Sequence, residues 1–445
     1  MTNAKHGKEI LAKFFDEGAF TTYFSEADSA VVAAFGSANG EPVYALCQNG
    51  NAMSVKDNQN AVKFIKMAAK TGNPIVTFYN SVGAKLEEGL DALKANANLT
   101  AAVSEISGVV PQIAVVTGVC GASSALAAAS ADICIMSKTA EMFLTPPYTS
   151  NAQGDKLAGA GSAEFAAKAG VVHIVVDTAE EAAAKAAVLV GILPSNNLSS
   201  PALFNAQASA SKINLAKYDA LQACESIADQ DSLTVISTYC GKEVVTALGA
   251  VSVNVVGFVA TNGENDTMCK SCVAKAARFV RFCDAFSIPV ITLINTDGFK
   301  KSSTGDMAGG IREAARLAGT YADATTAKLA VFTGKAVSTA YTAFANADVC
   351  IALQGCVIAP IDPKTAVTVL YKDEIANGEN IVSDTDKLAD KYANEKCSAA
   401  AAVEAGLADI SANADTLRAC VVSALDMLST KRTQRLPKKH GNMAL

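Results

Sequence analysis

An internal repeat constrains this chain more than any other feature of its sequence. Residues 61–84 and 276–299 share one order of features: an amphipathic helical stretch, a turn with proline, a β-branched apolar run and a turn with glycine. Pro74 and Pro289, at matching places, lie 215 positions apart (289 − 74). The two segments therefore have the pattern expected of two copies of one structure.

A second pair of segments keeps nearly the same spacing. Residues 112–136 match residues 328–352, and their glycines, Gly118 and Gly334, lie 216 positions apart (334 − 118). Such a repeat is far longer than the ~20–50 residues of a solenoid unit. It predicts two copies of one domain fold.

Each copy alternates apolar strands with helical stretches, and the first begins as a hairpin with Asn39-Gly40 at its turn. This order predicts an α/β layered fold in both copies. Proline, serine and asparagine interrupt the periodicity near residues 193–225, which predicts a linker. We therefore expect an N-terminal domain over residues 1–200 and a C-terminal domain over residues 201–445.

Composition excludes several classes of protein. Half of the 445 residues are hydrophobic and 18% are charged, so the chain can bury sizeable cores and is not a disordered chain. The formal net charge is −6 and the basic residues are scattered, which argues against nucleic acid as a partner. No apolar run reaches 18 residues, and residues 1–10 lack the features of a signal peptide, so we expect a cytoplasmic protein.

The 12 cysteines are spread from Cys47 to Cys420, which in a cytosolic chain predicts reduced thiols. Cys269 and Cys272 form a CxxC pair, but the sequence has no second such pair and no Cys/His pair at zinc-finger spacing. We expect these to be two thiols in a loop before a helix, and we expect no metal site.

The usual catalytic side chains are sparse. The chain has three histidines, and two of them, His6 and His440, lie near the ends of the sequence. His173 lies in a strand-like run, where a packed histidine is favoured over a catalytic base. The motifs of a P-loop, a zinc protease, an EF-hand and a dinucleotide site are absent from the sequence. Side-chain catalysis is therefore disfavoured.

Backbone groups remain as candidates for chemistry. In each copy a short apolar strand leads into a turn of small residues, 118–123 or 334–340, and then into an Ala-rich helix. Small residues at a helix N-terminus leave N–H groups accessible, and the helix dipole favours negative charge there. Such a turn can hold an oxyanion, although tight packing without a ligand would also explain one turn alone. Its presence in both copies favours the oxyanion interpretation.

These segments resemble a known family, the carboxyltransferase subunits of biotin-dependent acyl-CoA carboxylases and decarboxylases. That family includes the propionyl-CoA carboxylase β subunit and the methylmalonyl-CoA decarboxylase α subunit. The similar stretches follow the family order along nearly the whole chain, at residues 14–20, 68–89, 108–122, 142–147, 193–197, 275–299, 309–325, 333–341, 366–371 and 438–445. The resemblance implies an α/β fold of two tandem crotonase-like (ClpP/crotonase) domains.

The resemblance also implies the activity. Members move a carboxyl group between carboxybiotin on a separate carrier protein and the α-carbon of a short acyl-CoA, such as propionyl-CoA or acetyl-CoA. Carboxybiotin can release CO2 and then supply the base for the α-proton, which fits the shortage of histidines. The implied cofactor is biotin and the implied substrate is the coenzyme A thioester. No metal is implied.

The resemblance implies several partners, because the sequence has no biotin attachment motif and no ATP-binding motif. They are a biotin carrier protein, a biotin carboxylase subunit and further copies of this chain. The implied assembly is a homo-hexamer built as a trimer of dimers. Its active sites would form between the N-terminal domain of one subunit, on the acyl-CoA side, and the C-terminal domain of the dimer partner, on the biotin side.

Site residues are implied by their motif positions. The implied catalytic groups are the backbone amides of Ala122, Ser123, Thr339 and Ala340. The implied acyl-CoA-binding residues are Ser81, Gly83, Lys85 and Gly121. The implied biotin-binding residues are Gly298, Phe299 and Thr342.

The chain departs from the family pattern at some of these positions. The family usually has Gly-Gly in place of Ala122-Ser123 and glycine in place of Thr339; the N–H donors survive, but a Cβ enters the space where a ligand approaches. Lys85 stands where the family has arginine, and these cations differ at a planar contact.

Two alternatives stay open at this point. One is the soluble α subunit of a sodium-pumping decarboxylase, which would run the same half-reaction in reverse beside a membrane subunit. The other is a non-catalytic assembly paralogue, suggested by the lost glycines.

Overall fold

The structure is a computed structural model of the 445-residue chain. It describes residues 3–24, 26, 28–200, 207–263, 267–378, 380–434, 436–439 and 441–442. The middle of the expected linker, His440 and the last three residues lie outside this set. The chain divides into two compact units, Met1–Ala202 with Ser237–Cys240, and Leu203–Ile236 with Gly241–Leu445.

The short segment Ser237–Cys240 belongs to the first unit although it follows residue 201, which the sequence places in the second domain. Its backbone explains this, because the Ser237 N–H donates to the His173 carbonyl at 2.8 Å. His173 is buried, and its Nδ1 accepts the backbone N–H of Cys134 at 2.8 Å. The prediction of a packed histidine is confirmed.

The first unit contains a mixed sheet whose described strands have the order β1-β2-β3-β4-β5-β7-β9. The first three pair antiparallel and the rest pair parallel. The hairpin turn expected at Asn39-Gly40 joins β2 to β3, and both of its residues have positive φ. The strands are β1 (Phe20–Tyr23), β2 (Val31–Ala38), β3 (Glu41–Gln48), β4 (Ile75–Tyr79), β5 (Gln112–Val116), β7 (Ile133–Ser137) and β9 (Ile174–Val176).

Helices cover both faces of this sheet. One layer contains α1 (Asn3–Phe14) and α7 (Ala179–Ile192), which contact each other. The other contains α2 (Val55–Thr71), α3 (Gly89–Glu105) and α4 (Ser123–Ser130). Phe64 and Ile65 of α2 pack into the main apolar core. The shorter elements are η1 (Leu86–Glu88), α5 (Pro147–Ala152), α6 (Ala163–Lys168) and the paired strands β6 (Val119–Gly121) and β8 (Glu141–Phe143).

The second unit repeats this plan. Its described strands have the order β10-β11-β12-β13-β14-β15-β17, again antiparallel over the first three and parallel after them. The strand β16 pairs with the end of β14, as β8 pairs with β6 in the first unit. The strands are β10 (Thr234–Ile236), β11 (Val244–Val251), β12 (Asn254–Thr261), β13 (Val290–Thr296), β14 (Lys328–Val337), β15 (Val349–Leu353), β16 (Val357–Ala359) and β17 (Ile410–Ala412). The α/β prediction holds for both copies.

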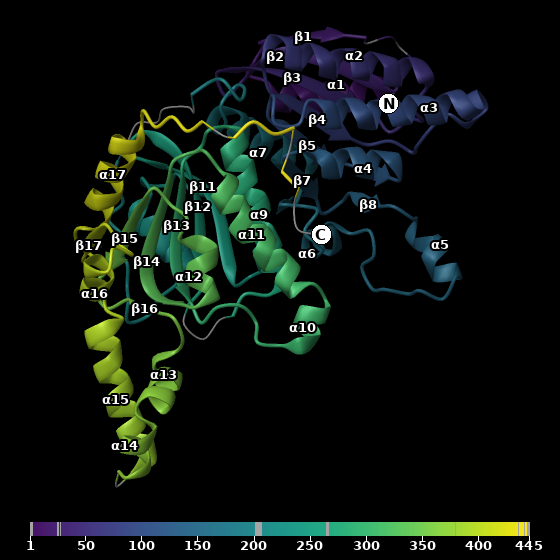
Figure 1. Ribbon diagram of the computed structural model, residues 1–445. Helices are drawn as coiled ribbons and strands as arrows, with labels where there is room; N and C mark the ends of the chain where they lie inside the picture. The colour runs from purple at the N-terminus through teal and green to yellow at the C-terminus, as the bar shows by residue number, and fades with distance from the viewer. Residues whose placement is uncertain are drawn as a thin grey trace. The chain divides into compact units, whose positions relative to one another are not determined.

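Helices also cover both faces of the second sheet (Figure 1). The helices α8 (Ala220–Ile227) and α17 (Leu417–Leu428) share a core on one face. The helices α9 (Lys270–Ala285), α11 (Gly310–Asp323) and α12 (Thr339–Phe344) form a layer of their own. The remaining helices are α10 (Ser303–Met307), α13 (Pro363–Leu370), α14 (Lys372–Ala376), α15 (Ile381–Lys396) and α16 (Ala399–Glu404).

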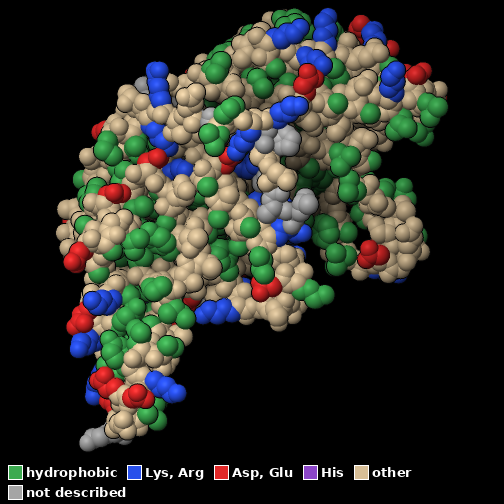
Figure 2. All heavy atoms as spheres, viewed as in Figure 1, with side chains coloured by type: hydrophobic (Ala, Val, Ile, Leu, Met, Phe, Trp, Pro, Cys, Tyr) green, Lys and Arg blue, Asp and Glu red, His purple; other side chains and the backbone are tan. Residues whose placement is uncertain are grey.

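The helices α13, α14 and α15 extend beyond the sheet of the second unit and have a small core of their own (Figure 1). Apolar side chains remain exposed on them beside charged ones (Figure 2). The most exposed of these side chains are those of Val369, Leu370, Ile381 and Val382. Across the described residues, no helix has both the length and the apolar character needed to cross a bilayer.

Candidate active site

A pair of asparagines holds the two small-residue turns in place, and sequence reasoning missed them. Asn80 follows β4, and its Oδ1 accepts the N–H of Val119 at 3.3 Å. Asn295 lies near the end of β13, and its Oδ1 accepts the N–H of Lys335 at 3.0 Å. The asparagines lie 215 positions apart (295 − 80), so the repeat extends to the side chains that build the turns.

The glycines of these turns are required by the close approach of the asparagines. A Cβ on Gly118 would lie 2.1 Å from Oδ1 of Asn80, and a Cβ on Gly334 would lie 2.1 Å from Oδ1 of Asn295. Both distances are far inside van der Waals contact. Each turn therefore requires glycine at this position, because the asparagine side chain occupies the space that a Cβ would need.

Both turns end on a residue with strained backbone. Ala122 precedes α4 with φ 50° and ψ −118°, and Ser338 precedes α12 with φ 56° and ψ −121°. Each is anchored by its own N–H, which donates to the end of a neighbouring strand: Ala122 to the Phe143 carbonyl at 2.9 Å, and Ser338 to the Ala359 carbonyl at 2.8 Å. The two positions are equivalent, 216 residues apart (338 − 122).

This geometry corrects one predicted catalytic group. The N–H of Ala122 is already bonded, so the prediction that it serves as an oxyanion donor is wrong. The amides equivalent to Thr339 and Ala340 are those of Ser123 and Ser124, in the first turn of α4. In the described part of the chain, none of these four N–H groups has a hydrogen-bond acceptor, as expected at an uncapped helix start.

The strain at Ala122 leads to a stability prediction. Only glycine occupies this φ/ψ region without cost, and a non-glycine residue there loses roughly 1–3 kcal/mol. Ala122→Gly is therefore expected to stabilise the protein by about 1 kcal/mol, after the entropy of the extra glycine is subtracted, as measured by urea unfolding. Ala129→Gly, at an exposed position of α4, should instead destabilise it by up to about 1 kcal/mol. Equal signs for the two variants would contradict a strained Ala122.

Three of the predicted acyl-CoA residues lie on the turn that follows β4, and the fourth, Gly121, ends β6. Ser81 is buried, its hydroxyl donates to the Asn51 carbonyl at 2.9 Å, and it accepts the Gly83 N–H at 3.1 Å. Gly83 has φ 113°, which favours glycine. Ser81 and Gly83 thus shape the turn. Lys85 is exposed, and Gly121 packs so closely on Phe143 that a Cβ would lie 2.6 Å from its ring.

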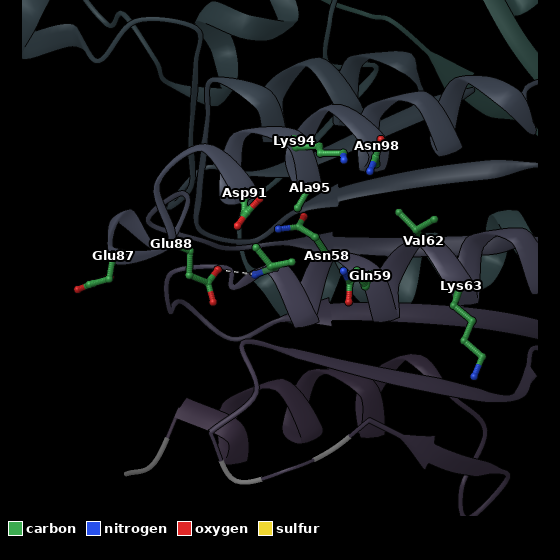
Figure 3. Close-up of a pocket in the computed structure, with 11 residues that line it drawn as sticks. Asn58, Gln59, Val62, Lys63, Glu87, Glu88, Asp91, Lys94, Ala95 and Asn98 are labelled. Atoms are coloured by element: carbon green, nitrogen blue, oxygen red, sulfur yellow. Dashed lines mark hydrogen bonds between the residues drawn. The ribbon is translucent and has the colours of Figure 1, made fainter.

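Two hollows on the first unit do not bring the predicted acyl-CoA residues together. Lys85 lines a hollow of about 300 Å³ together with Lys56. A larger hollow of about 800 Å³ lies between α2 and α3 (Figure 3) and contains none of the predicted residues. Its wall includes Lys63 and Lys94 but also three carboxylates, and Glu88 accepts the N–H of Val55 at 2.6 Å. Carboxylates in the wall disfavour the phosphates of coenzyme A.

The second unit has a cavity of about 530 Å³ that brings two predicted residues together. Phe299 and Thr339 both line it, and the rest of the wall comes mainly from the N-terminus of α9 and from α10 and α11. Gly298, next to Phe299, has φ 103° and donates its N–H to Oγ1 of Thr296 at 3.1 Å. Thr342 is outside this wall; it is exposed and donates its hydroxyl to the Ser338 carbonyl at 3.3 Å.

Nearby side chains add little chemistry of their own. Cys120 is part of the first turn and its side chain is fully buried. Burial raises the pKa of its thiol above the ordinary value, so it is not a thiolate at neutral pH. At the second turn, Lys335 forms an ion pair with Asp297 at 3.3 Å. The open backbone amides are therefore the groups best placed to stabilise charge.

Each of the two repeated α/β units has open amides at a helix start that follows a glycine turn, an arrangement that can stabilise an oxyanion through the main chain. The family model of the carboxyl transferase domain matches residues 8–443, and the chain belongs to this family. The resemblance seen in the sequence is confirmed.

Individual relatives cover nearly the whole chain. The chain is 31% identical to the methylmalonyl-CoA carboxyltransferase 12S subunit of Propionibacterium freudenreichii subsp. shermanii, over 96% of this chain and 88% of the relative. It is 28% identical to the methylmalonyl-CoA decarboxylase subunit alpha of Veillonella parvula, over 98% and 92%.

A solved structure shows the same fold. The crystal structure of transcarboxylase 12S, described as a hexamer assembly with methylmalonyl-coenzyme A and methylmalonic acid bound, superposes with a TM-score of 0.91 at 28% identity. The match covers 99% of this chain and 92% of that one. The predicted pair of crotonase-like domains is confirmed.

Proposed function

We propose that this chain is the carboxyltransferase subunit of a biotin-dependent enzyme. It moves a carboxyl group between carboxybiotin on a separate carrier protein and the α-carbon of a short acyl-CoA. The observation that carries the proposal is the duplicated turn, with open amides at Ser123 and Ser124 in one unit and at Thr339 and Ala340 in the other. Transfer of a carboxyl group between two carbonyl-bearing reactants develops negative charge on one oxygen of each reactant. One pair of open amides is available to stabilise each of these oxygens.

The two turns have different roles in this proposal. The turn of the first unit holds the thioester oxygen of the acyl-CoA, with Gly83, Lys85 and Gly121 around it. The turn of the second unit holds the ureido oxygen of biotin. Bound carboxybiotin supplies the CO2 and the base for the α-proton, so the chain needs to supply only position and charge stabilisation.

The cavity of the second unit supports its assignment to biotin. Its volume of about 530 Å³ falls within the ~300–1,000 Å³ of small-molecule sites. A bicyclic ring with one polar carbonyl needs apolar contact and one donor group. Phe299 provides the first and the amide of Thr339 provides the second, with Gly298 shaping the turn beside them. Thr342 stays a predicted contact.

Relatives guide the choice of substrate and partners. Both relatives above are named for methylmalonyl-CoA, so we assign the propionyl-CoA/methylmalonyl-CoA pair ahead of acetyl-CoA/malonyl-CoA.

We also propose a homo-hexamer, and the exposed apolar side chains of α13–α15 support burial against another subunit (Figure 2). A biotin carrier and a biotin carboxylase subunit complete the assembly. The cytoplasmic location stays a prediction.

The reverse direction has support of its own, because one relative is a decarboxylase subunit. As that subunit, the chain would pass the carboxyl group from the thioester to the carrier, and a membrane decarboxylase subunit would replace the biotin carboxylase. Both directions use the same two turns.

A carboxyl-transfer assay with free biotin tests the proposal. Purified protein is incubated with millimolar biotin and carboxyl-labelled methylmalonyl-CoA or malonyl-CoA. Label is followed into carboxybiotin, and the unlabelled propionyl-CoA or acetyl-CoA that forms at the same time is quantified. We expect biotin-dependent transfer with methylmalonyl-CoA above that with malonyl-CoA. A well-assembled oligomer that transfers label from neither thioester would contradict the proposal and favour an assembly role.

A further inference from the structure

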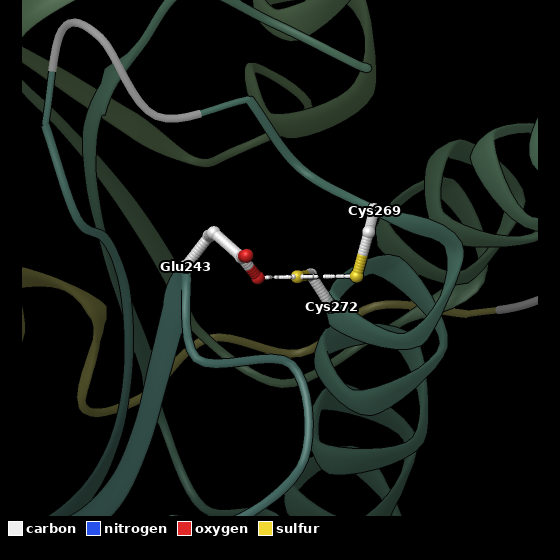
Figure 4. Close-up of side chains that lie close together, drawn as sticks. All are labelled: Glu243, Cys269 and Cys272. Atoms are coloured by element: carbon white, nitrogen blue, oxygen red, sulfur yellow. Dashed lines mark hydrogen bonds between the residues drawn. The ribbon is translucent and has the colours of Figure 1, made fainter. Parts of the chain in front are cut away.

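Three side chains with metal-binding atoms meet in the second unit, next to the start of α9. Glu243, Cys269 and Cys272 each offer one ligand atom, and the three atoms lie within 4.8 Å of one another (Figure 4). The Cys272 sulfur lies 2.7 Å from Oε2 of Glu243 and 3.0 Å from the Cys269 sulfur. The expectation of two thiols in a loop is therefore wrong: Cys269 is the N-cap of α9, and Cys272 lies inside its first turn.

The first unit shows what ordinarily occupies these positions. Ser54 and Asp57 stand 215 residues before Cys269 and Cys272 (269 − 54, 272 − 57), at the start of α2. They form a capping box, in which each side chain accepts the backbone N–H of the other residue. In the second unit the Cys269 side chain accepts no backbone N–H from the first turn of the helix. The second unit therefore lacks the complete capping box and has two cysteine sulfurs at the two equivalent positions.

Glu243 decides between the two usual uses of a CxxC pair. A disulfide needs only the two sulfurs and gives no role to the carboxylate oxygen that lies 2.7 Å from the Cys272 sulfur. A divalent cation compensates the charge of two thiolates and a carboxylate together. Two sulfurs with one oxygen suit a thiophilic ion such as Zn²⁺.

We propose that Cys269, Cys272 and Glu243 bind one Zn²⁺ ion, with a water molecule as the fourth ligand. Binding releases the two thiol protons to solvent, and no redox change occurs. A tetrahedral site requires sulfurs about 3.8 Å apart and a sulfur–oxygen separation of about 3.6 Å, which small side-chain rotations reach from the observed distances. The site does not rest on the proposed function.

Position in the fold suggests what the ion does. Glu243 directly precedes β11, so the ion would tie this strand to the N-terminus of α9. Cys269 also lines the cavity that contains Thr339. Metal binding would therefore stiffen one wall of that cavity.

The experiment titrates the metal-free, reduced full-length protein with Co²⁺ and then displaces it with Zn²⁺. We expect one ion per chain, a thiolate-to-cobalt absorption band, and a higher melting temperature with Zn²⁺ than without. Cys269→Ser and Cys272→Ser should weaken binding by roughly 100-fold or more, because each removes a direct ligand. Cys420→Ser, which changes a half-buried cysteine on α17, is the matched control and should leave binding unchanged.

Glu243→Gln keeps the size of the side chain and removes its charge, so it tests the third ligand in a protein that keeps its packing. It should weaken Zn²⁺ binding while the two sulfurs still give the cobalt band. Wild-type affinity in Cys272→Ser, or the lack of a thiolate band in the parent protein, would overturn the site. A disulfide would be assigned instead if the reduced protein took up no metal and if mild oxidation lowered its mass by about 2 Da and made the cysteine pair resistant to alkylation.

Discussion

Gly334→Ala is expected to destabilise the protein by about 3 kcal/mol and to lower carboxyl transfer to biotin by at least ~100-fold. The added Cβ would lie 2.1 Å from Oδ1 and 2.2 Å from Cγ of Asn295. Asn295 is buried and bonded to the amide of Lys335, so its side chain cannot turn away without leaving that N–H unpaired. The turn must move, and the amides of Thr339 and Ala340 move with it. Urea unfolding and the transfer assay measure the two effects.

Gly118→Ala should have the same effect in the first unit, where the Cβ would meet Asn80. In the proposed division of roles, Gly118→Ala weakens the use of acyl-CoA and leaves the dependence of the rate on biotin concentration unchanged. Gly334→Ala weakens the use of biotin and leaves the dependence of the rate on acyl-CoA concentration unchanged. Gly319→Ala is the matched control, because Gly319 lies in α11 and a Cβ there would meet no side chain or backbone beyond its own helical turn. Alanine at this position should stabilise the helix. Identical kinetic defects in the two turn variants would refute separate roles.

Arg418→Ala is expected to destabilise the second unit by about 3–5 kcal/mol. Arg418 on α17 donates to Oδ1 of Asp229 at 2.5 Å and to the Ile227 carbonyl at 3.1 Å. Asp229 is buried, with 3% of its side chain exposed, so removal of the arginine leaves a buried carboxylate without its cation. Urea unfolding, followed by the loss of far-UV circular dichroism, measures the change.

Two further variants check the cause. Arg418→Ala with Asp229→Ala removes both charges and should be less destabilising than removal of the arginine alone. Lys212→Ala breaks an ion pair with Asp415 in which both side chains are largely exposed, and it should cause no measurable change. If Arg418→Ala were as mild as Lys212→Ala, buried charge would not be what holds α17.

Much of the fold follows from patterns that are visible without coordinates. Strand and helix periods repeat at a fixed spacing, and glycine recurs where each strand meets its helix, because those positions have no room for a side chain. Asn80 and Asn295 were equally visible, since the same residue stands at equivalent places in both copies. Their role was missed because an asparagine in a turn has many possible partners.

The sequence by itself determined that two copies of an α/β unit are present and that each places a small-residue turn before a helix. These features depend on short patterns of residue types along the chain, so they can be recognised without knowing which distant segments are in contact. Only the tertiary structure decided which amides are open. The N–H of Ala122 is bonded to Phe143, and a sequence does not show which neighbouring strand will use a donor.

The same holds for the proposed metal site. Cys269 and Cys272 are adjacent on the helix, but Glu243 is 26 residues earlier (269 − 243) and belongs to the loop before β11. Sheet pairing brings β11 and α9 into contact, and the carboxylate reaches the sulfurs for that reason. Contacts between distant segments depend on how the sheet is assembled, and this information is spread over the whole chain.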